Sequence, residues 1–244
     1  MRSGRVVEAI SAGAVGAAIG GTFGSRLFGL GVPLAVVAGA NGAISGWRGT
    51  YEWTSPRGVG AFVLDSTWAG LTTTAGLVAN AVGMVQPNSG YSVALSARQN
   101  RHVYARGLQL RKGFATTFGR VVAGAGDLSR PRRAKLVTDH ENVHAWQARW
   151  FGPAYPALYA GWLAGGAVAG AAVWATVRRD ERLSKVVESC AYYLNPFEWW
   201  AYSRDDHWPP SGIVDRLGWK QPAVQPFAAR PPARTSPTPA SPSS

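Results

Sequence analysis

Cysteine, histidine and acidic residues are all scarce in this chain of 244 residues. Cys190 is the only cysteine, so no disulfide can form within the chain, and one thiol cannot build a cysteine-type metal cluster. There are only four histidines, and 13 Asp and Glu stand against 25 Lys and Arg, which gives a net charge of +12. Any metal must therefore be held by histidine and carboxylate side chains. A negatively charged partner, either nucleic acid or an anionic membrane face, has to be considered.

The low share of charged residues excludes general disorder. Apolar residues make up 46% of the chain and charged residues only 16%. The length fits one domain together with membrane segments. The exception is the C-terminus, where residues 220–244 are a mixture of Pro, Ala, Ser and Arg without periodicity, so we expect a disordered tail there.

Three long stretches have almost no charge. Residues 9–47 contain only Arg26, residues 58–97 contain only Asp65, and residues 150–177 contain no charge. The last stretch includes residues 153–177, which are enough to cross a hydrocarbon core of about 30 Å as a helix. We therefore predict a transmembrane segment at 153–177. Its glycine pairs at spacing four, Gly161 with Gly165 and Gly166 with Gly170, are typical of helices that approach closely in lipid.

The N-terminal stretch also favours membrane helices. Gly16, Gly20 and Gly24 recur at spacing four, and a second apolar run follows from Leu27 to Ile44. We expect a glycine-rich helical hairpin over residues 1–50, with a pair of soluble helices as the alternative. The segment 59–85 is apolar but contains Asp65 and several threonines. It is a candidate for a third membrane-associated element, which need not span the bilayer.

Residues 91–125 change pattern to short runs rich in Val, Tyr, Phe and Thr. This pattern predicts a small antiparallel sheet, whose outward residues supply basic charge, with His102 at its surface. Residues 98–135 contain ten Lys or Arg and one acid, Asp127. Because apolar segments flank this region and no nucleic-acid motif is present, we favour a basic, lipid-facing cytoplasmic surface over nucleic-acid binding. Residues 127–133 are expected to be a loop, with a helix starting near Ala134.

The motif that carries chemistry is His140-Glu141-x-x-His144. Residues four apart lie above one another on a helix, so both imidazoles can reach one ion while Glu141 faces a water bound to it. Four positions near the histidines are uncharged (Thr138, Asn142, Val143 and Ala145), and Trp146 follows, which suits a helix that comes directly after strands.

The run VTDHENVHAW resembles the active-site helix of zincin metallopeptidases. The resemblance implies that His140 and His144 are zinc ligands and that Glu141 is the general base. A third histidine shortly after His144, as in metzincins, is absent, whereas gluzincins use a glutamate on a later helix. Glu188 and Glu198 both fit, each with alanine three positions on, and Glu198 is preferred because Asn195-Pro196 is a natural helix start.

The two segments HENVHAWQARWFGPAYPALYAGW and NPFEWWAYSRDDHWPP together resemble bacterial membrane proteins of gluzincin type. The order of motif, apolar segment and ligand helix is similar to that of membrane-embedded peptidases of the prenyl-protein and heat-shock type. Peptide hydrolysis also needs a hydrogen-bond donor for the oxyanion and a group that orients a ligand imidazole. Several residues are candidates for each of these two roles. The donor candidates are Tyr202, Tyr193 and His207, and the orienting candidates are Asp205 and Asp206.

Taken together, the sequence predicts an α+β protein in which glycine-rich membrane helices precede a zincin-like domain over residues 51–219. That domain contains the sheet, the active-site helix, a further apolar helix and a ligand-bearing helix. The expected activity is zinc-dependent hydrolysis of a peptide or protein substrate by an integral protein of the cell membrane. The alternative is a non-catalytic membrane-associated protein that has a metal site and a basic lipid-facing surface.

Overall fold

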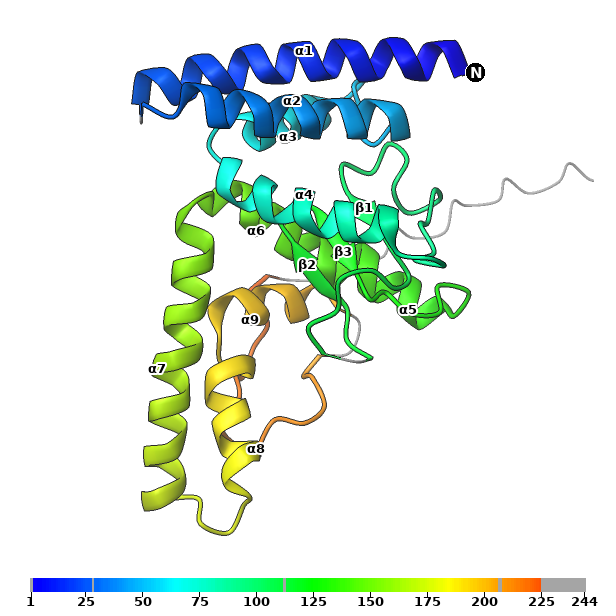
Figure 1. Cartoon of the computed structure of the whole chain (residues 1–244). Coiled ribbons are helices and arrows are strands. Elements are labelled where there is room, and N and C mark those ends of the chain that lie inside the picture. Colours follow the sequence, from blue (N-terminus) through cyan, green and yellow to red (C-terminus); the bar gives the residue numbers. More distant parts are fainter. Residues whose placement is uncertain (1, 28, 112, 206–207, 225–244) are drawn as a thin grey trace, which may run out of the picture.

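A computed structural model describes residues 2–27, 29–111, 113–205 and 208–224, which are mostly helical with one small sheet (Figure 1). This arrangement is consistent with the α+β class. The expected tail lies largely outside the described residues. The elements are α1 (Arg2–Leu27), α2 (Gly31–Arg48), α3 (Pro56–Ser66), α4 (Gly70–Val85), β1 (His102–Val103), β2 (Thr116–Phe118), β3 (Val121–Ala123), α5 (Pro131–Leu136), the π-helical turn η1 (Val137–Glu141), α6 (Asn142–Phe151), α7 (Ala154–Thr176), α8 (Leu183–Glu188), the π-helical turn η2 (Ser189–Tyr193) and α9 (Pro196–Ser203).

The N-terminal hairpin forms as expected, from α1 and α2 side by side (Figure 1). The glycines of α1 allow the close approach. A Cβ atom added at Gly16 would lie 2.6 Å from the carbonyl oxygen of Ala38, and one at Gly20 would lie 2.8 Å from the Ala38 Cβ. Any larger residue at these two positions would therefore push the helices apart.

The apolar segment 59–85 forms two helices rather than one. α3 and α4 meet at a bend of 92°. α3 begins at Pro56, and the side chain of Ser55 caps it by accepting from the backbone N–H of Gly58 at 3.0 Å. α4 covers one face of the sheet, where Ala79 packs with Tyr104 and Val121.

The sheet is mixed, so the prediction of an antiparallel sheet is wrong. β3 is central: it pairs parallel with β1, through His102 and Val121, and antiparallel with β2, through Thr116 and Ala123. The run at 91–95 forms turns instead of a strand, apart from a bridge between Tyr91 and Tyr104. Because the backbone N–H groups of Arg98 and Asn100 bond to the α2–α3 connection instead of to a strand, this segment joins the hairpin to the sheet.

The opposite face of the sheet carries the HExxH segment. Val103 and Val122 pack there against Val137, the first residue of η1. The expected loop at 127–133 ends early, because α5 starts at Pro131 rather than near Ala134. Proline is favoured at the first helical position, where its missing N–H has no partner to lose. The layers α4, sheet and η1–α6 together fix the position of the motif.

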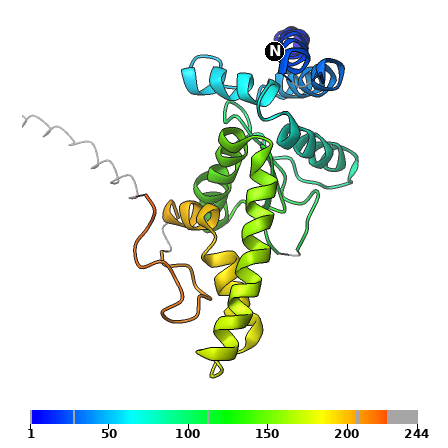
Figure 2. The same ribbon diagram turned by 90° about the vertical axis from the view of Figure 1, so that its left-hand side faces the viewer.

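Two helices within the described residues are long and apolar enough to cross a membrane: α1 over Ser3–Leu27, and α7 over Ala154–Thr176. The bent pair α3–α4 is a possible third span. α7 packs against α8 and η2, and a Cβ at Gly166 would lie 2.6 Å from the carbonyl oxygen of Cys190, whereas Gly161 and Gly165 face open space. In both views, Figure 1 and Figure 2, the hairpin lies across the direction of α7.

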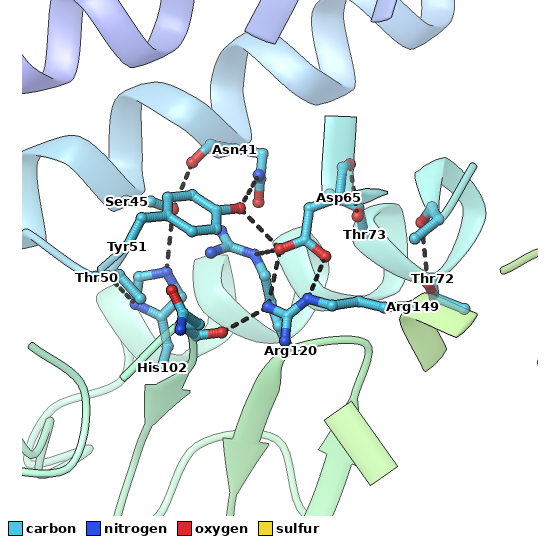
Figure 3. A network of polar contacts seen from close by, with 12 residues as sticks. Asn41, Ser45, Thr50, Tyr51, Asp65, Thr72, Thr73, His102, Arg120 and Arg149 are labelled. Atoms are coloured by element: carbon cyan, nitrogen blue, oxygen red, sulfur yellow. Dashed lines mark hydrogen bonds and ion pairs between the residues drawn. The ribbon is translucent and has the colours of Figure 1, made fainter. Parts of the chain in front are cut away.

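A buried polar network ties the hairpin, α3, the sheet and α6 together (Figure 3). Its centre is Asp65, which pairs with Arg149 at 2.9 Å and with Arg120 at 3.8 Å, and which accepts from the Tyr51 hydroxyl at 2.8 Å. Asn41 of α2 in turn donates to the Tyr51 oxygen at 2.9 Å. Asp65, the one charge in an otherwise apolar stretch, is therefore a fold determinant.

Two expectations about exposure on the sheet are wrong. His102 is fully buried rather than at the surface, and its ring lies 3.0 Å from the Tyr91 hydroxyl and 3.4 Å from the Ser45 hydroxyl. Burial holds the pKa of His102 well below its usual range, so the ring is neutral. Arg101 and Arg120 are also buried, so part of the basic charge points inward.

Candidate metal centre

The HExxH motif crosses the junction between η1 and α6. His140 and Glu141 end the π-helical turn, and His144 lies in the first turn of α6. Both histidines are buried, and their Nε2 atoms lie 3.2 Å apart. The structure therefore places both imidazoles where the spacing predicted, on one face and directed at one point.

Glu198 completes the cluster from α9. That helix begins at Pro196, and the Asn195 side chain caps it by accepting from the Phe197 N–H at 3.0 Å. One oxygen of Glu198, Oε2, lies 3.4 Å from the Nε2 of His140, and the other, Oε1, lies 3.3 Å from the Nε2 of His144. The three residues form a buried group with one ligand atom each, all within 4.8 Å of one another.

Glu188, the alternative third ligand, does not lie at this site. Its side chain is 45% exposed at the end of α8, where it is 3.6 Å from Arg111. Both glutamates have an alanine three positions on, but only Glu198, the one preferred from the sequence, lies beside the histidines.

The donor set fits a divalent metal ion. Catalytic zinc has three protein ligands at roughly 2.0–2.2 Å, which in a tetrahedron places neighbouring ligand atoms roughly 3.3–3.5 Å apart. The two Nε2 atoms are 3.2 Å apart, close to this spacing, and each lies within 3.4 Å of a different oxygen of Glu198: Oε2 for His140 and Oε1 for His144. In addition, Oε2 of Glu198 is buried without a hydrogen-bond donor among the described residues. A buried carboxylate oxygen without a donor is costly unless a cation binds it.

Gln147 and Tyr155 orient the ring of His144. The Gln147 amide donates from Nε2 to the carbonyl oxygen of Phe197 at 2.9 Å, which turns its Oε1 toward the Nδ1 of His144, 2.8 Å away. The Tyr155 hydroxyl lies 3.3 Å from the same Nδ1. Because Gln147 Oε1 can only accept, the hydrogen of a neutral His144 sits on Nδ1, which leaves the Nε2 lone pair for a metal.

Tyr159 orients the carboxylate of Glu198. Its hydroxyl donates to Oε1 at 2.6 Å. Tyr155 and Tyr159 come from the first turns of α7, so the apolar helix supplies contacts to two of the three metal-ligating residues. Neither these tyrosines nor Gln147 was among the residues predicted from the sequence. The spacing of four between Tyr155 and Tyr159 at the start of an uncharged helix was the available signal.

The cluster is electrostatically coupled. Burial alone would raise the pKa of Glu198, but the charge of His144 and the close approach of both imidazoles hold it well below its usual range. Burial alone would lower the pKa of His144, but Glu198 raises it to about 9, with a smaller contribution from Glu141. His144 is therefore protonated at neutral pH, and a metal ion that bound its Nε2 would have to displace that proton.

Glu141 lies beside the cluster and is held by the sheet. Its carboxylate is buried and accepts from the Thr117 hydroxyl of β2 at 2.7 Å. Its charge also contributes, after that of Glu198, to the raised pKa of His144. Thr117 is another contact that the sequence analysis missed, because it depends on which strand lies over the helix.

The other candidate residues have different positions. The ring of Tyr202 lies 4.4 Å from that of His140, and burial raises the pKa of Tyr202, which keeps the phenol protonated. Tyr193 donates to the carbonyl oxygen of Ser211 at 3.2 Å. Asp205 accepts from Arg132 at 2.7 Å. His207 and Asp206 lie outside the described residues.

Comparison with protein families, with curated proteins and with solved structures finds no match to this chain. The case for function therefore depends on the site itself.

Proposed function

We propose that this chain is a zinc-dependent, membrane-associated metallopeptidase. The observation that carries the proposal is the convergence of His140, His144 and Glu198 at one buried point, with Glu141, also buried, next to His140 in the chain. Two imidazoles and one carboxylate are a ligand set of catalytic zinc, which keeps a fourth position for water. The resemblance to the gluzincin active-site helix supports the same assignment.

Each residue has a defined task in this proposal. His140, His144 and Glu198 would hold the ion, which when bound lowers the pKa of water to roughly 7 and polarises a carbonyl group. Glu141 accepts the proton of the attacking water and delivers it to the leaving amine. Thr117 keeps one Glu141 oxygen in place through its hydrogen bond, and Tyr202, whose ring lies 4.4 Å from that of His140, is the proposed donor to the developing oxyanion.

The proposed location is the cell membrane. The two apolar helices α1 and α7 support membrane association. The proposed side of the site is cytoplasmic, because residues 98–135 carry an excess of basic charge and such segments are retained on that side.

Glu141→Gln is the variant that tests this function. The full chain, purified in detergent and loaded with zinc, should cleave members of a mixed peptide library, detected by mass spectrometry of the products. Glu141→Gln should keep one zinc per chain and lose about 10²–10⁴-fold in cleavage rate, because the general base is removed while the ligands remain.

A matched control is Asp139→Asn, which removes a neighbouring carboxylate that pairs with Lys135 on the opposite face of the helix. It should leave both zinc content and cleavage unchanged. A parent protein that holds zinc but cleaves no peptide in the library would instead favour the non-catalytic alternative. Equal cleavage by the parent and Glu141→Gln would refute the proposed role of Glu141.

A further inference from the structure

A second concave site lies on the face of the HExxH helix that points away from the metal ligands. This pocket has a volume of about 560 Å³. It is formed where α3, α5, α6 and α9 meet, and α3, α6 and α9 lie on the same side of the molecule in Figure 2. Its side chains are mainly cationic or indole groups: Arg57, Lys135, Trp146, Trp150, Trp200 and Arg204.

The charge around this pocket is unbalanced. The Arg57 guanidinium lies 4.5 Å from the centre of the Trp146 ring, and that of Arg149 lies 4.9 Å from it, so two cations flank one indole. The acid in the pocket lining, Asp139, lies 3.5 Å from Lys135. Arg149 forms an ion pair with Asp65, but Asp65 also pairs with Arg120. An anion in the pocket would offset this excess of positive charge.

A buried arginine behind the pocket wall is incompletely paired. Arg101 is 3% exposed and donates to the Asn142 side chain, itself in the pocket lining, at 2.8 Å. Its Nε has no acceptor among the described residues. Burial lowers the pKa of Arg101 to about 10, and repulsion by Arg149 and Arg57 adds to that effect. A cation held there without a full set of acceptors strengthens the positive potential of the pocket.

The position of the pocket indicates where the anion comes from. Trp150, on its wall, is 60% exposed and precedes the apolar helix α7 by only a few residues. Its carbonyl oxygen accepts from the indole N–H of Trp68 at 3.1 Å, and Trp68 is also exposed, at the α3–α4 bend. Exposed indoles with arginines at the end of an apolar helix are typical of the membrane interface, where lipid headgroups lie.

We propose that this pocket binds the phosphate group of an anionic phospholipid. The headgroup phosphate lies among Arg57, Lys135 and the edge of Asn142, and the tryptophans contact the upper part of the acyl chains. Because the pocket lies behind the metal-ligand helix, bound lipid would hold α3, α6 and α9 together. The proposal is independent of peptide hydrolysis and does not require an occupied metal site.

Lipid binding can be measured directly on the full chain in detergent. Native mass spectrometry would follow titration with phosphatidylglycerol and, separately, with phosphatidylcholine. The parent should prefer phosphatidylglycerol. Arg57→Gln should weaken phosphatidylglycerol binding roughly fivefold, and Arg57→Gln with Lys135→Gln roughly 30-fold, since each basic residue near a headgroup contributes about that factor. Both side chains are exposed, so neither change should disturb folding.

The matched control is Arg130→Gln, an exposed arginine of the same basic region that lies beside Asp127 and outside the pocket lining. It should bind phosphatidylglycerol as the parent does. For the parent alone, rising sodium chloride concentration should weaken phosphatidylglycerol binding. This measurement tests the proposal without any variant.

Three results would overturn the proposal. The first is equal binding of the two lipids by the parent, which would exclude recognition of headgroup charge. The second is unchanged affinity in the double variant, which would place the lipid elsewhere. The third is complete displacement of phosphatidylglycerol by inorganic phosphate with no preference for the lipid, which would assign the pocket to free phosphate.

Discussion

Two buried clusters, one around Asp65 and one around Glu198, each place a carboxylate between two basic side chains. The two carboxylates differ in how many of their oxygens accept a hydrogen bond. In the Asp65 cluster, Oδ1 accepts from Arg149, and Oδ2 accepts from both Arg149 and Tyr51 (Figure 3). In the Glu198 cluster, Oε1 accepts from Tyr159, whereas Oε2 faces His140 without a donor among the described residues. A fully hydrogen-bonded carboxylate, as in Asp65, stabilises the fold, whereas a buried oxygen without a donor, as in Glu198, is available to a cation.

The basic partners differ in the same way. Arginine is always charged and offers donors but no lone pair, so Arg149 can neutralise Asp65 but cannot bind a metal. An imidazole, unlike a guanidinium, offers a lone pair when it carries no extra proton, so His140 and His144 are side chains that can bind a metal. The helix segment η1–α6 contributes to both clusters, with the histidines on one side and Arg149 on another. The candidate metal site and the buried ion pair are thereby built on one short segment.

The largest expected difference between the clusters is in metal content. Glu198→Ala should abolish stoichiometric zinc, because it removes one of three ligands, while Glu188→Ala, the matched change at an exposed glutamate, should leave one zinc per chain. Elemental analysis of desalted protein measures this directly. Loss of zinc in Glu188→Ala and its retention in Glu198→Ala would contradict the site.

Asp65→Asn should destabilise the fold by about 3–5 kcal/mol, because it leaves Arg149 and Arg120 buried without a counter-charge. The free energy of unfolding in denaturant measures the effect, and an excess of chelator removes any contribution from metal. Under the same conditions Glu198→Ala should cost less. If Asp65→Asn were as stable as the parent, the Asp65 cluster would not be the one that holds the fold.

A smaller effect is expected from Tyr159→Phe, which removes only the hydroxyl that donates to Glu198. Its zinc affinity should fall about 10–100-fold, the usual result of losing a group that orients a ligand. Competition with a chromogenic chelator gives the affinity. Tyr193→Phe is the control, because that hydroxyl donates to Ser211 instead and its loss should leave zinc affinity unchanged. Equal affinities for the parent and Tyr159→Phe would show that Glu198 is positioned by its own helix alone.

The metal ligands were predictable to the extent that they depend on local geometry. His140 and His144 are four residues apart on one helical segment, so their proximity follows from the helix repeat. Glu198 became the preferred third ligand through a local signal as well, the Asn-Pro start of α9, which the structure shows with its side-chain cap. Glu188 could be set aside only from the tertiary structure, which places it near Arg111 on the surface.

Contacts between distant segments were beyond the sequence. The parallel pairing of β1 with β3, the burial of His102 and the hydrogen bond from Thr117 to Glu141 each depend on which elements become neighbours. A run of Val and Thr indicates a strand, but it does not say which strand lies beside it. The buried arginines show the same limit, since composition alone places Arg at the surface.

The sequence by itself therefore determined the helical hairpin, the apolar helix α7 and the pair of histidines, because helix repeat, glycine spacing and apolar length are properties of neighbouring residues. The tertiary structure decided the rest. It brought Glu198 to the two histidines, placed Tyr155 and Tyr159 of an apolar helix against residues of that cluster, and enclosed Asp65 between two arginines. These outcomes depend on packing, which brings together groups that are far apart in the chain and leaves each buried polar atom either paired or open to a ligand.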